Sequence, residues 1–590
     1  MTDRAPGRAL LWLLGFAVLA VLLTWPAVVP DGSAVSARGD YLINLWNFWW
    51  MDSALEQGSS PFTTDRLYAP EGISLARHTL SPANALLGGR LARSFGGHDA
   101  FKLMLVAHFA LSAWVFFLLA RELVGCAQGA ALGAVLWSWS PYHAYYMAQI
   151  NVASLEGLPL ALLFMVRCWR HGGVANAVGV ALSAGLLAAT SSYYLVYAAL
   201  LGGLLLAGGR FVVPEVPWRR GALRLALAGA AAGVVVAVVA WPLVSALLGV
   251  GGGGEAITGE AVTGGARRQA LRSNDLLGFS WVGPPERLVV SWPTMFGFTT
   301  LAVLVAGWRA LRGRLAWVAA AAFFFVLGLG PELQVGGEAT GVTLPGAWLV
   351  DLPVFAMLRK PDRFFLLVNL FVALLLAAAW AGLAARLTAP RRRALWGVAF
   401  ALLCLELSLA PLTTLDVSRS PLLADIAAGD ARSLVDLPYS GGSPYEARAN
   451  HAQTLHGKAI PGGYVTNLAL TDAHRATAER WREADAALDR GQAGPLVALA
   501  AEQDIELLVL HKTEPKPRRP DAGDRVVWAP FALVRDELVT MRQLGHLEER
   551  PVPRGALQKR RRALVRAVGE PVLEDELLAV FDTRPAAGDR

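Results

Sequence analysis

Long apolar runs, separated by short polar segments, dominate the first two thirds of the chain. A helix that crosses a membrane needs about 20 mostly apolar residues, and we predict eleven such spans, of which the third is short. They lie at about 9–29, 101–120, 128–141, 151–168, 174–190, 192–208, 223–249, 293–308, 315–330, 364–384 and 394–412. The pattern predicts a polytopic α-helical membrane domain over residues 1–412, whose first run is a retained anchor rather than a cleaved signal peptide.

Positive charge is concentrated on one side of these spans. If the N-terminus is cytoplasmic, the cytoplasmic segments hold 16 arginines against three acids, Asp3, Glu122 and Glu215. The arginines are Arg4, Arg8, Arg121, Arg167, Arg170, Arg210, Arg219, Arg220, Arg224, Arg309, Arg312, Arg314, Arg386, Arg391, Arg392 and Arg393. Such an excess marks the cytoplasmic side of a cell (inner) membrane. An odd number of spans then places the C-terminus outside, together with long loops at about 30–100, 250–292 and 331–363.

The pattern changes at residue 413, where charged residues become common and short β-like runs alternate with helical ones. The predicted strands lie at 433–437, 506–510, 525–528, 563–568 and 577–581, and the predicted helices at 471–488 and 495–503. This alternation is typical of a small α/β domain, and about 175 residues suffice to bury a core. We therefore predict an extracytoplasmic α/β domain over residues 413–590.

The composition agrees with this division. Of the 590 residues, 55% are hydrophobic and 17% are charged, and the mean hydropathy is +0.43. These values exclude a disordered chain, a disulfide-rich miniprotein and an ordinary cytosolic enzyme. The net charge of +7 does not indicate nucleic acid, because most of the surplus lies on the predicted cytoplasmic side. Three cysteines without metal-ligand spacing predict neither a disulfide framework nor a zinc site.

The first external loop carries the first candidate site. Asp40 precedes the segment LINLWNFWWM at 42–51, whose spacing and tryptophan content predict a helix lying in the membrane interface. Asp40 is then either the N-cap of that helix, a catalytic carboxylate, or both. His78 follows in the same loop, where it is either a structural residue or a substrate-binding one.

A second polar cluster, SPYHAYYMAQIN at 140–151, lies where the chain turns between the third and fourth predicted spans. Tyr142 and His143 belong to it, and packing in an aromatic belt would explain the tyrosines without a function. Glu156 lies about one turn inside the fourth predicted span. An acid at that depth faces a cavity or a partner, so a structural ion pair and a site residue both remain open.

The third cluster is LRKPDRFF at 358–365, at the outer mouth of the tenth predicted span. Arg359, Lys360 and Arg363 are external bases, against the general rule for membrane proteins. Pro361 favours the start of a helix, and helix N-termini favour anions. Because arginine also offers a bidentate fork to phosphate, this cluster predicts a phosphate site, although lipid headgroups would meet the same bases.

An external carboxylate and external bases at a helix start would together suit a lipid-linked phosphate substrate. The bases would hold the phosphate leaving group, and the carboxylate would accept the proton of an attacking hydroxyl at a sugar carbon.

Taken in order, GD, YAPEG-SL-HTLSP-N, SPYH, LRKPDRF and the tail strand IELLVLH at 505–511 resemble bacterial membrane proteins of the GT-C glycosyltransferase superfamily. These are relatives of the protein mannosyltransferases and the lipid A aminoarabinose transferase, in a group that is largely uncharacterised. The resemblance covers about residues 10–410. It implies a polyprenyl-phosphate-sugar donor, a glycan, lipid or protein acceptor, and an inverting transfer outside the membrane.

The resemblance also implies roles for particular residues. Asp40 matches the aspartate that acts as base or binds a metal, and the Arg359, Lys360 and Arg363 group matches the bases that hold the lipid phosphate. His78, Tyr142, His143 and Glu156 are expected to help bind donor or acceptor. The paired acidic motif of the protein mannosyltransferases is absent, because Tyr41 follows Asp40. A divalent metal is therefore left open, with Glu156, Asp52 and Glu255 as candidate second carboxylates.

Two other functions compete with the glycosyltransferase. A transporter or flippase for a lipid-linked glycan would use the same basic mouth, but it would need a continuous polar path through several spans, of which the sequence shows little. A non-catalytic envelope assembly protein would depend on its external domain rather than on Asp40.

Overall fold

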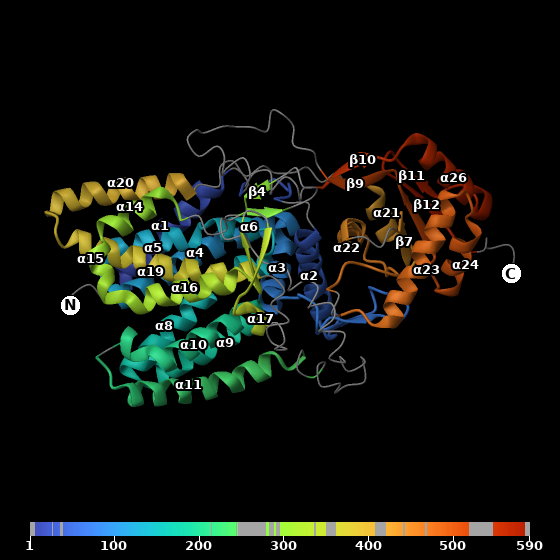
Figure 1. The fold of residues 1–590 in the computed structure, drawn as a ribbon. Coiled ribbons are helices and arrows are strands. Elements are labelled where there is room, and N and C mark those ends of the chain that lie inside the picture. The colour runs from blue at the N-terminus through green and yellow to red at the C-terminus, as the bar shows by residue number, and fades with distance from the viewer. Residues whose placement is uncertain are drawn as a thin grey trace.

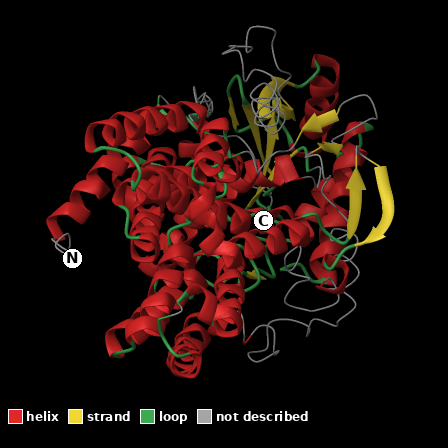
Figure 2. Cartoon of the chain, turned by 60° about the vertical axis from the view of Figure 1, so that its left-hand side comes forward, coloured by secondary structure: helices red, strands yellow, loops and turns green. Residues whose placement is uncertain are grey.

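The computed structural model describes most of the chain. It covers residues 6–25, 28–35, 39–213, 215–242, 245, 279–281, 288–290, 296–335, 338–349, 361–407, 420–439, 443–466, 469–517 and 547–584. A helical bundle occupies one end of the molecule and a smaller part with a mixed sheet occupies the other (Figure 1). Seen from a second direction, the bundle is helical throughout, and the strands gather on the side of the smaller part (Figure 2).

The bundle is built from helices of unequal length. They are α1 (Pro6–Thr24), α4 (Gly97–Val124), α5 (Ala127–Ser138), α8 (Gly157–His171), α9 (Val174–Thr190), α10 (Ser192–Val212), α11 (Trp218–Val239), α14 (Phe298–Ala306), α15 (Trp308–Leu311), α16 (Leu315–Gly328), α19 (Phe365–Ala384) and α20 (Ala389–Leu407). In the part described, six helical stretches are long and apolar enough to cross a membrane. They are Gly97–Val124, Ile150–His171, Ser192–Val212, Trp218–Val239, Trp308–Gly328 and Pro361–Ala384. The chain is thus a multi-pass membrane protein, while the count of eleven spans stays a prediction.

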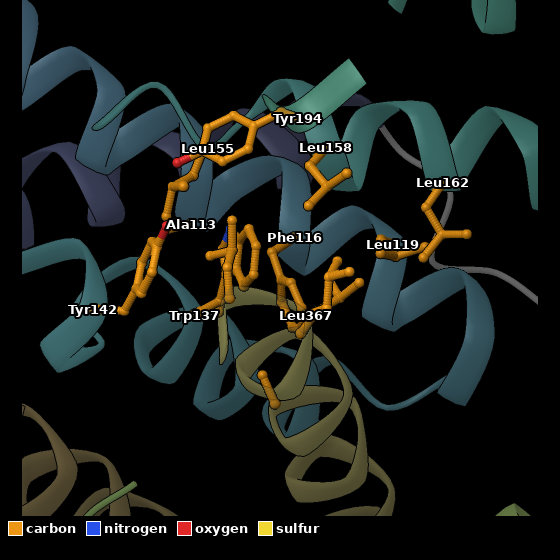
Figure 3. Packing of buried hydrophobic residues seen from close by; sticks show 14 of the residues in the cluster. Ala113, Phe116, Leu119, Trp137, Tyr142, Leu155, Leu158, Leu162, Tyr194 and Leu367 are labelled. Atoms are coloured by element: carbon orange, nitrogen blue, oxygen red, sulfur yellow. The ribbon is translucent and has the colours of Figure 1, made fainter. Parts of the chain in front are cut away.

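The centre of the bundle is formed by α4, α5, α8 and α19, whose apolar side chains point toward one another (Figure 3). Four side chains are fully buried there, those of Phe116, Trp137, Leu158 and Leu367. Small residues let two of these helices approach closely, as is common in membrane bundles. At Gly133 of α5, an added Cβ would lie 2.6 Å from the carbonyl oxygen of Ala373 in α19.

Between the bundle and the smaller part lie shorter elements. They are α2 (Gly39–Glu56), β1 (Thr63–Thr64), β2 (Ile73–Ser74), α3 (Pro82–Phe95), α6 (Pro141–Tyr146), α7 (Ile150–Ala153), β3 (Phe279–Trp281), β4 (Leu288–Val290), η1 (Arg312–Arg314), β5 (Glu332–Val335), β6 (Glu338–Thr343), α17 (Gly346–Leu349) and η2 (Pro361–Phe364). Strands β1–β2, β3–β4 and β5–β6 form three separate antiparallel pairs.

Helix α2 is buried on two opposite faces. Leu45 and Phe48 pack into the core of the bundle, whereas Trp46 and Trp50 pack into a core that they share with the C-terminal part. The helix predicted at 42–51 therefore exists, but its assignment to the membrane interface was wrong. Its tryptophans are covered by protein, because residues almost 400 positions later fold back over them.

The C-terminal part has its own sheet, in the order β11-β12-β8-β7. Its elements are α21 (Leu422–Ala428), β7 (Leu434–Leu437), α22 (Ser443–His456), α23 (Asp472–Asp489), α24 (Gly494–Glu502), β8 (Leu507–His511), β9 (Thr513–Pro517), β10 (Leu547–Pro551), α26 (Arg554–Val568), β11 (Leu573–Glu574) and β12 (Leu578–Asp582). Strands β7 and β8 are parallel, and β12 is antiparallel to β8. Because side chains alternate along a strand, Leu508 faces α23, α24 and α26, while Val509 faces α2 and the first external loop.

Most predicted elements of this part are found within a few residues of their expected positions. The exception is 563–568, predicted as a strand, which forms the last turns of α26. The preceding basic residues belong to the same helix, where Arg560 pairs with Asp485 at 2.8 Å and Arg561 pairs with Glu574 at 2.9 Å. The predicted strand at 525–528 and the glycine-rich segment 249–265 lie outside the described residues.

Residues predicted to face the cytoplasm meet at one end of the bundle. Glu122 accepts hydrogen bonds from Arg167 at 3.3 Å and from Arg170 at 3.1 Å, and Arg170 also pairs with Glu215 at 3.0 Å. Helix α15 lies at the end of the bundle remote from the C-terminal part (Figure 1). Three predicted cytoplasmic segments thus lie at the same end of the bundle. That this end faces the cytoplasm is inferred from the arginine excess alone.

Candidate active site

Asp40 lies in the first turn of α2, where negative charge is favoured by the helix dipole. It is only partly buried, and its Oδ2 accepts a 2.7 Å hydrogen bond from the side-chain amide of Gln149. A carboxylate has about four lone-pair sites, so this bond orients the group and, among the described residues, leaves capacity for a substrate hydroxyl. Asp40 lies inside the first turn of the helix rather than at its N-cap. Of its two expected roles, the position therefore disfavours that of the N-cap.

The turn at 146–149 contacts both Asp40 and the third sequence cluster. The backbone N–H of Gln149 donates to the carbonyl of Tyr146 at 2.8 Å, which makes 146–149 one tight turn. From the other end of this turn, the Tyr146 hydroxyl donates to Asp362 at 2.6 Å. Three segments separated by more than 100 residues each therefore converge: the start of α2, the turn after α6, and η2 at the start of α19.

Arg363 is the described base at this convergence, next to the acid Asp362. It is 8% exposed, and its guanidinium lies over the ring of Tyr193 at 4.0 Å and over that of Tyr146 at 5.5 Å. Its Nε is buried and has no hydrogen-bond partner among the residues that the structure describes. A buried charge is costly unless it is paired. Cation–π contacts offset part of that cost, and an anionic ligand would offset more.

The start of α19 has the form that the sequence predicts. Pro361 opens η2, a single 3-10 turn that runs directly into α19 at Phe365. Arg363 is thus held at a helix N-terminus, where backbone N–H groups also favour an anion. Arg359 and Lys360, the other two predicted phosphate ligands, lie outside the described residues.

His78 is placed at the joint between the first external loop and the C-terminal part. Its Nε2 contacts Oδ1 of Asn47 in α2 at 3.2 Å, and its Nδ1 accepts the backbone N–H of Thr466 at 3.3 Å. Burial lowers the pKa of His78 to about 4. Both ring nitrogens are committed to protein groups, so the geometry suits a neutral joint residue better than a ligand-binding one.

His143 and Tyr142 lie in the bundle core rather than at an open surface. The His143 ring nitrogens lie 2.6 Å from the carbonyl oxygen of Ser138 and 2.7 Å from that of Ala153, and its ring stacks on Phe109. No ring nitrogen is left for a substrate. Tyr142 is fully buried and packs against the ring of Tyr146, with the centroids 4.8 Å apart. These two residues support the turn and do not line an opening.

Glu156 has a protein partner. It precedes α8 at the break between α7 and α8, rather than lying inside a continuous helix. Its Oε1 is 3.0 Å from Nδ1 of His108, and its Oε2 accepts a 3.3 Å hydrogen bond from Ser112. Of the two roles left open for this acid, the contacts are those of a structural pair.

A metal site around Asp40 does not fit the residues described. Asp52, the second carboxylate on α2, pairs with Arg90 at 3.3 Å and with Arg93. Glu156 is taken by His108, and Glu255 lies outside the described residues. Among the residues that were placed, no group of three or more His, Cys, Asp or Glu side chains could hold a metal ion.

Several contributors to this arrangement carried a weak signal or none in the sequence. Gln149 and Tyr146 belong to the second polar cluster, and Asp362 belongs to the third, but nothing in their spacing indicates which partner each one contacts. Tyr193 follows two serines at the start of α10, and no motif marked it. These are tertiary contacts, and a single sequence does not encode them in any local pattern.

Comparison with known proteins gives structural likeness without sequence likeness. No protein-family model matches the sequence, and no curated protein matches it. The archaeal oligosaccharyltransferase AglB from Archaeoglobus fulgidus, in complex with an inhibitory peptide and a dolichol-phosphate, is similar in structure. The TM-score is 0.50 and the identity 11%, covering 85% of this chain and 69% of that one. The same enzyme in its apo form gives a TM-score of 0.48 and 10% identity, covering 86% and 70%.

The arabinofuranosyltransferase AftD from mycobacteria has a TM-score of 0.48 and 17% identity, covering 85% of this chain but only 36% of AftD. Both neighbours are GT-C glycosyltransferases. The resemblance noticed in the sequence motifs and the likeness to AglB thus agree: this chain has the fold of a GT-C glycosyltransferase.

Proposed function

We propose that the chain is a membrane glycosyltransferase that moves a sugar from a polyprenyl-phosphate-linked donor to an extracytoplasmic acceptor, with inversion. The observation that carries this proposal is the convergence of Asp40 and Arg363 on the turn 146–149. A carboxylate and a buried cation thus contact the same short turn, and the Nε of that cation has no hydrogen-bond partner among the described residues. The AglB structure of the same fold holds a dolichol-phosphate, which supports a lipid-linked phosphate as donor.

In the proposed reaction, Asp40 accepts the proton of the acceptor hydroxyl while that oxygen attacks the anomeric carbon. The bond between this carbon and the phosphate oxygen breaks, and the phosphate leaves with the bonding electron pair. Arg363 neutralises the charge that develops on the leaving phosphate. A single displacement from the face opposite the leaving group inverts the configuration of the sugar. Gln149 orients Asp40, and Tyr193 with Tyr146 orients Arg363. No step is assigned to a metal.

The proposal predicts that Asp40→Asn abolishes transfer, because an amide cannot accept the proton at neutral pH. The expected loss is about 10²–10⁴-fold in kcat. The measurement uses purified protein in proteoliposomes with radiolabelled undecaprenyl-phosphate glucose, mannose and arabinose. The matched control is Asp52→Asn, twelve residues along the same helix, which should keep its transfer rate even if its salt bridges are lost.

Transfer at the wild-type rate by Asp40→Asn would show that Asp40 is not the base. Movement of the lipid-linked sugar across the proteoliposome membrane without any transfer would favour a flippase. Wild-type function of Asp40→Asn in cells, together with loss of function on deletion of 413–590, would favour an assembly protein.

A further inference from the structure

A cavity lies between the first external loop and the C-terminal part. Its volume is about 780 Å³, within the range of small-molecule sites. One wall is formed by the loop around β1 and β2, including Thr64 and Glu71, and another by Thr471 and His474 at the start of α23. The loop and α23 are pinned together by a hydrogen-bond-length contact of 3.0 Å between Nε2 of His474 and the carbonyl oxygen of Gly72.

The chemistry of the lining points to one class of ligand. Seven of the nineteen lining residues are serine or threonine, and Ile73 is the single branched aliphatic residue among them. Hydroxyl groups both donate and accept, which matches a ligand that itself carries many hydroxyls. A peptide-binding site would instead have apolar side-chain pockets or an open strand edge.

The charges around the cavity exclude a second phosphate site. Asp65 and Glu71 are exposed acids on its rim, and the lining bases among the described residues are Arg77 and His474. The acidic surplus disfavours an anion as ligand of this cavity. Trp50 and Phe62 add aromatic surface, on which the apolar C–H face of a sugar ring could pack.

Helix α2 connects this cavity to Asp40. Trp50 lies ten residues after Asp40 on the same helix, which corresponds to about 15 Å along its axis. Between them, Asn44 and Asn47 lie on the same face of the helix as Asp40, at the i+4 and i+7 positions, and both are buried. Asn44 donates to the carbonyl of Asp40 at 2.6 Å, and Asn47 contacts His78, the residue next to Arg77.

We propose that this cavity binds a neutral oligosaccharide. The binding site is inferred from the cavity itself. That the bound glycan is the acceptor of the transfer reaction rests on the proposed function. The enzyme then recognises an extended glycan rather than a single sugar, and binding strengthens with the length of the glycan.

The test measures binding of linear neutral oligosaccharides to the full-length protein in detergent, by saturation-transfer difference NMR. The probes are mannose, glucose and arabinofuranose series of one to six units. At least one series should bind, with affinity that rises at least tenfold from two to five units. Ala76→Trp, which fills the cavity, and Glu71→Gln, on an exposed position, should each remove most of that gain. Glu483→Gln, an exposed acid on the far part of α23, is the matched control and should keep it.

Absence of binding by all three series would overturn the proposal, as would binding that Ala76→Trp leaves unchanged in a protein with normal melting temperature. Preferential binding of a hydrophilic hexapeptide would overturn it in favour of a peptide acceptor. Asp40→Asn should bind the glycans like the wild type while transferring nothing. If glycans bind the cavity but no donor is ever used, the proposed transfer reaction fails and the binding site stands.

Discussion

At the scale of single residues, the proposed site depends on a cation that the fold buries between two aromatic rings. Arg363 keeps its charge in place through Tyr193 and Tyr146, and its planar fork suits a phosphate. Arg363→Lys keeps the charge but loses the fork and the stacking. We expect a rise of at least tenfold in the KM for the lipid-linked donor, and Arg363→Gln should be worse.

Donor titrations with the proteoliposome assay measure this effect. The matched control is Arg312→Lys, because Arg312 also lies over an aromatic ring, that of Trp308 at 4.4 Å, but at the remote end of the bundle. Equal KM values for Arg363→Lys and Arg312→Lys would contradict the assignment.

The other residue-scale prediction concerns acid. Burial holds the pKa of His78 at about 4, below the ordinary 6.5, so the folded state prefers the neutral ring. The stability that His78 contributes is complete above pH 6.5 and is lost as the pH falls toward 4. Protonation also removes the acceptor that Thr466 uses. The melting temperature should therefore drop by several degrees over this window.

His78→Gln should flatten that dependence, since glutamine does not titrate. Part of the slope should persist, because burial also lowers the pKa of His456 to about 4. Identical slopes for His78→Gln and the wild type between pH 6.5 and 4 would show that His78 is not responsible.

The sequence indicated the roles of some site residues but not of others. Asp40 and Arg363 stood out because a charge at an unusual position has few ordinary explanations. His143 had no such signal of its own, because the sequence does not distinguish a histidine that hydrogen-bonds backbone carbonyls from one that binds a substrate. The difference lies in Ser138 and Ala153, whose proximity only the folded chain reveals.

At the scale of elements, close packing of α5 on α19 holds the centre of the bundle. Gly133 leaves no room for a methyl group beside the Ala373 carbonyl oxygen, so Gly133→Ala should force the two helices apart. We expect a loss of about 1–3 kcal/mol, as for overpacked cores. Thermal unfolding in detergent measures it.

The matched control is Gly203→Ala in α10, where nothing lies within 4 Å of the added Cβ. It should be neutral or slightly stabilising, because alanine is the better helix former. A melting temperature for Gly133→Ala equal to that of Gly203→Ala would show that α5 and α19 have room to adjust.

Elements were the most predictable level of this protein. Apolar length located the long helices, and alternation located β7, β8 and β12. The strand expected at 563–568 failed because a short run rich in alanine and valine fits both a strand and the end of an amphipathic helix. The role of α2 failed for a different reason, since the partner that covers its tryptophans lies far along the chain.

At the scale of the whole molecule, one buried glutamine joins the C-terminal part to the bundle. Gln453 of α22 accepts the Trp46 indole N–H at 2.7 Å and donates to the carbonyls of Arg66 and Lys458 at 2.7 and 2.9 Å. Gln453→Leu should leave these groups unsatisfied at a cost of about 2–4 kcal/mol. Hydrogen exchange of α2 should then speed up.

A matched pair exists inside the C-terminal part, where Gln503 accepts the Trp481 indole N–H at 2.8 Å. Gln503→Leu should speed exchange in α23 and leave α2 protected. Faster exchange of α2 in both variants to the same extent would mean that the C-terminal part and the joint unfold together.

Joining of the C-terminal part to α2 has a consequence for how the protein is made. The apolar face of α2 around Trp46 and Trp50 emerges from the ribosome long before residues 423–580, which cover it. At about 5–20 residues per second, the roughly 370 residues between them take about 20–75 s to synthesise. During that interval the first external loop can cover these tryptophans only in part, so biogenesis must tolerate an exposed apolar surface until the C-terminal part has been made.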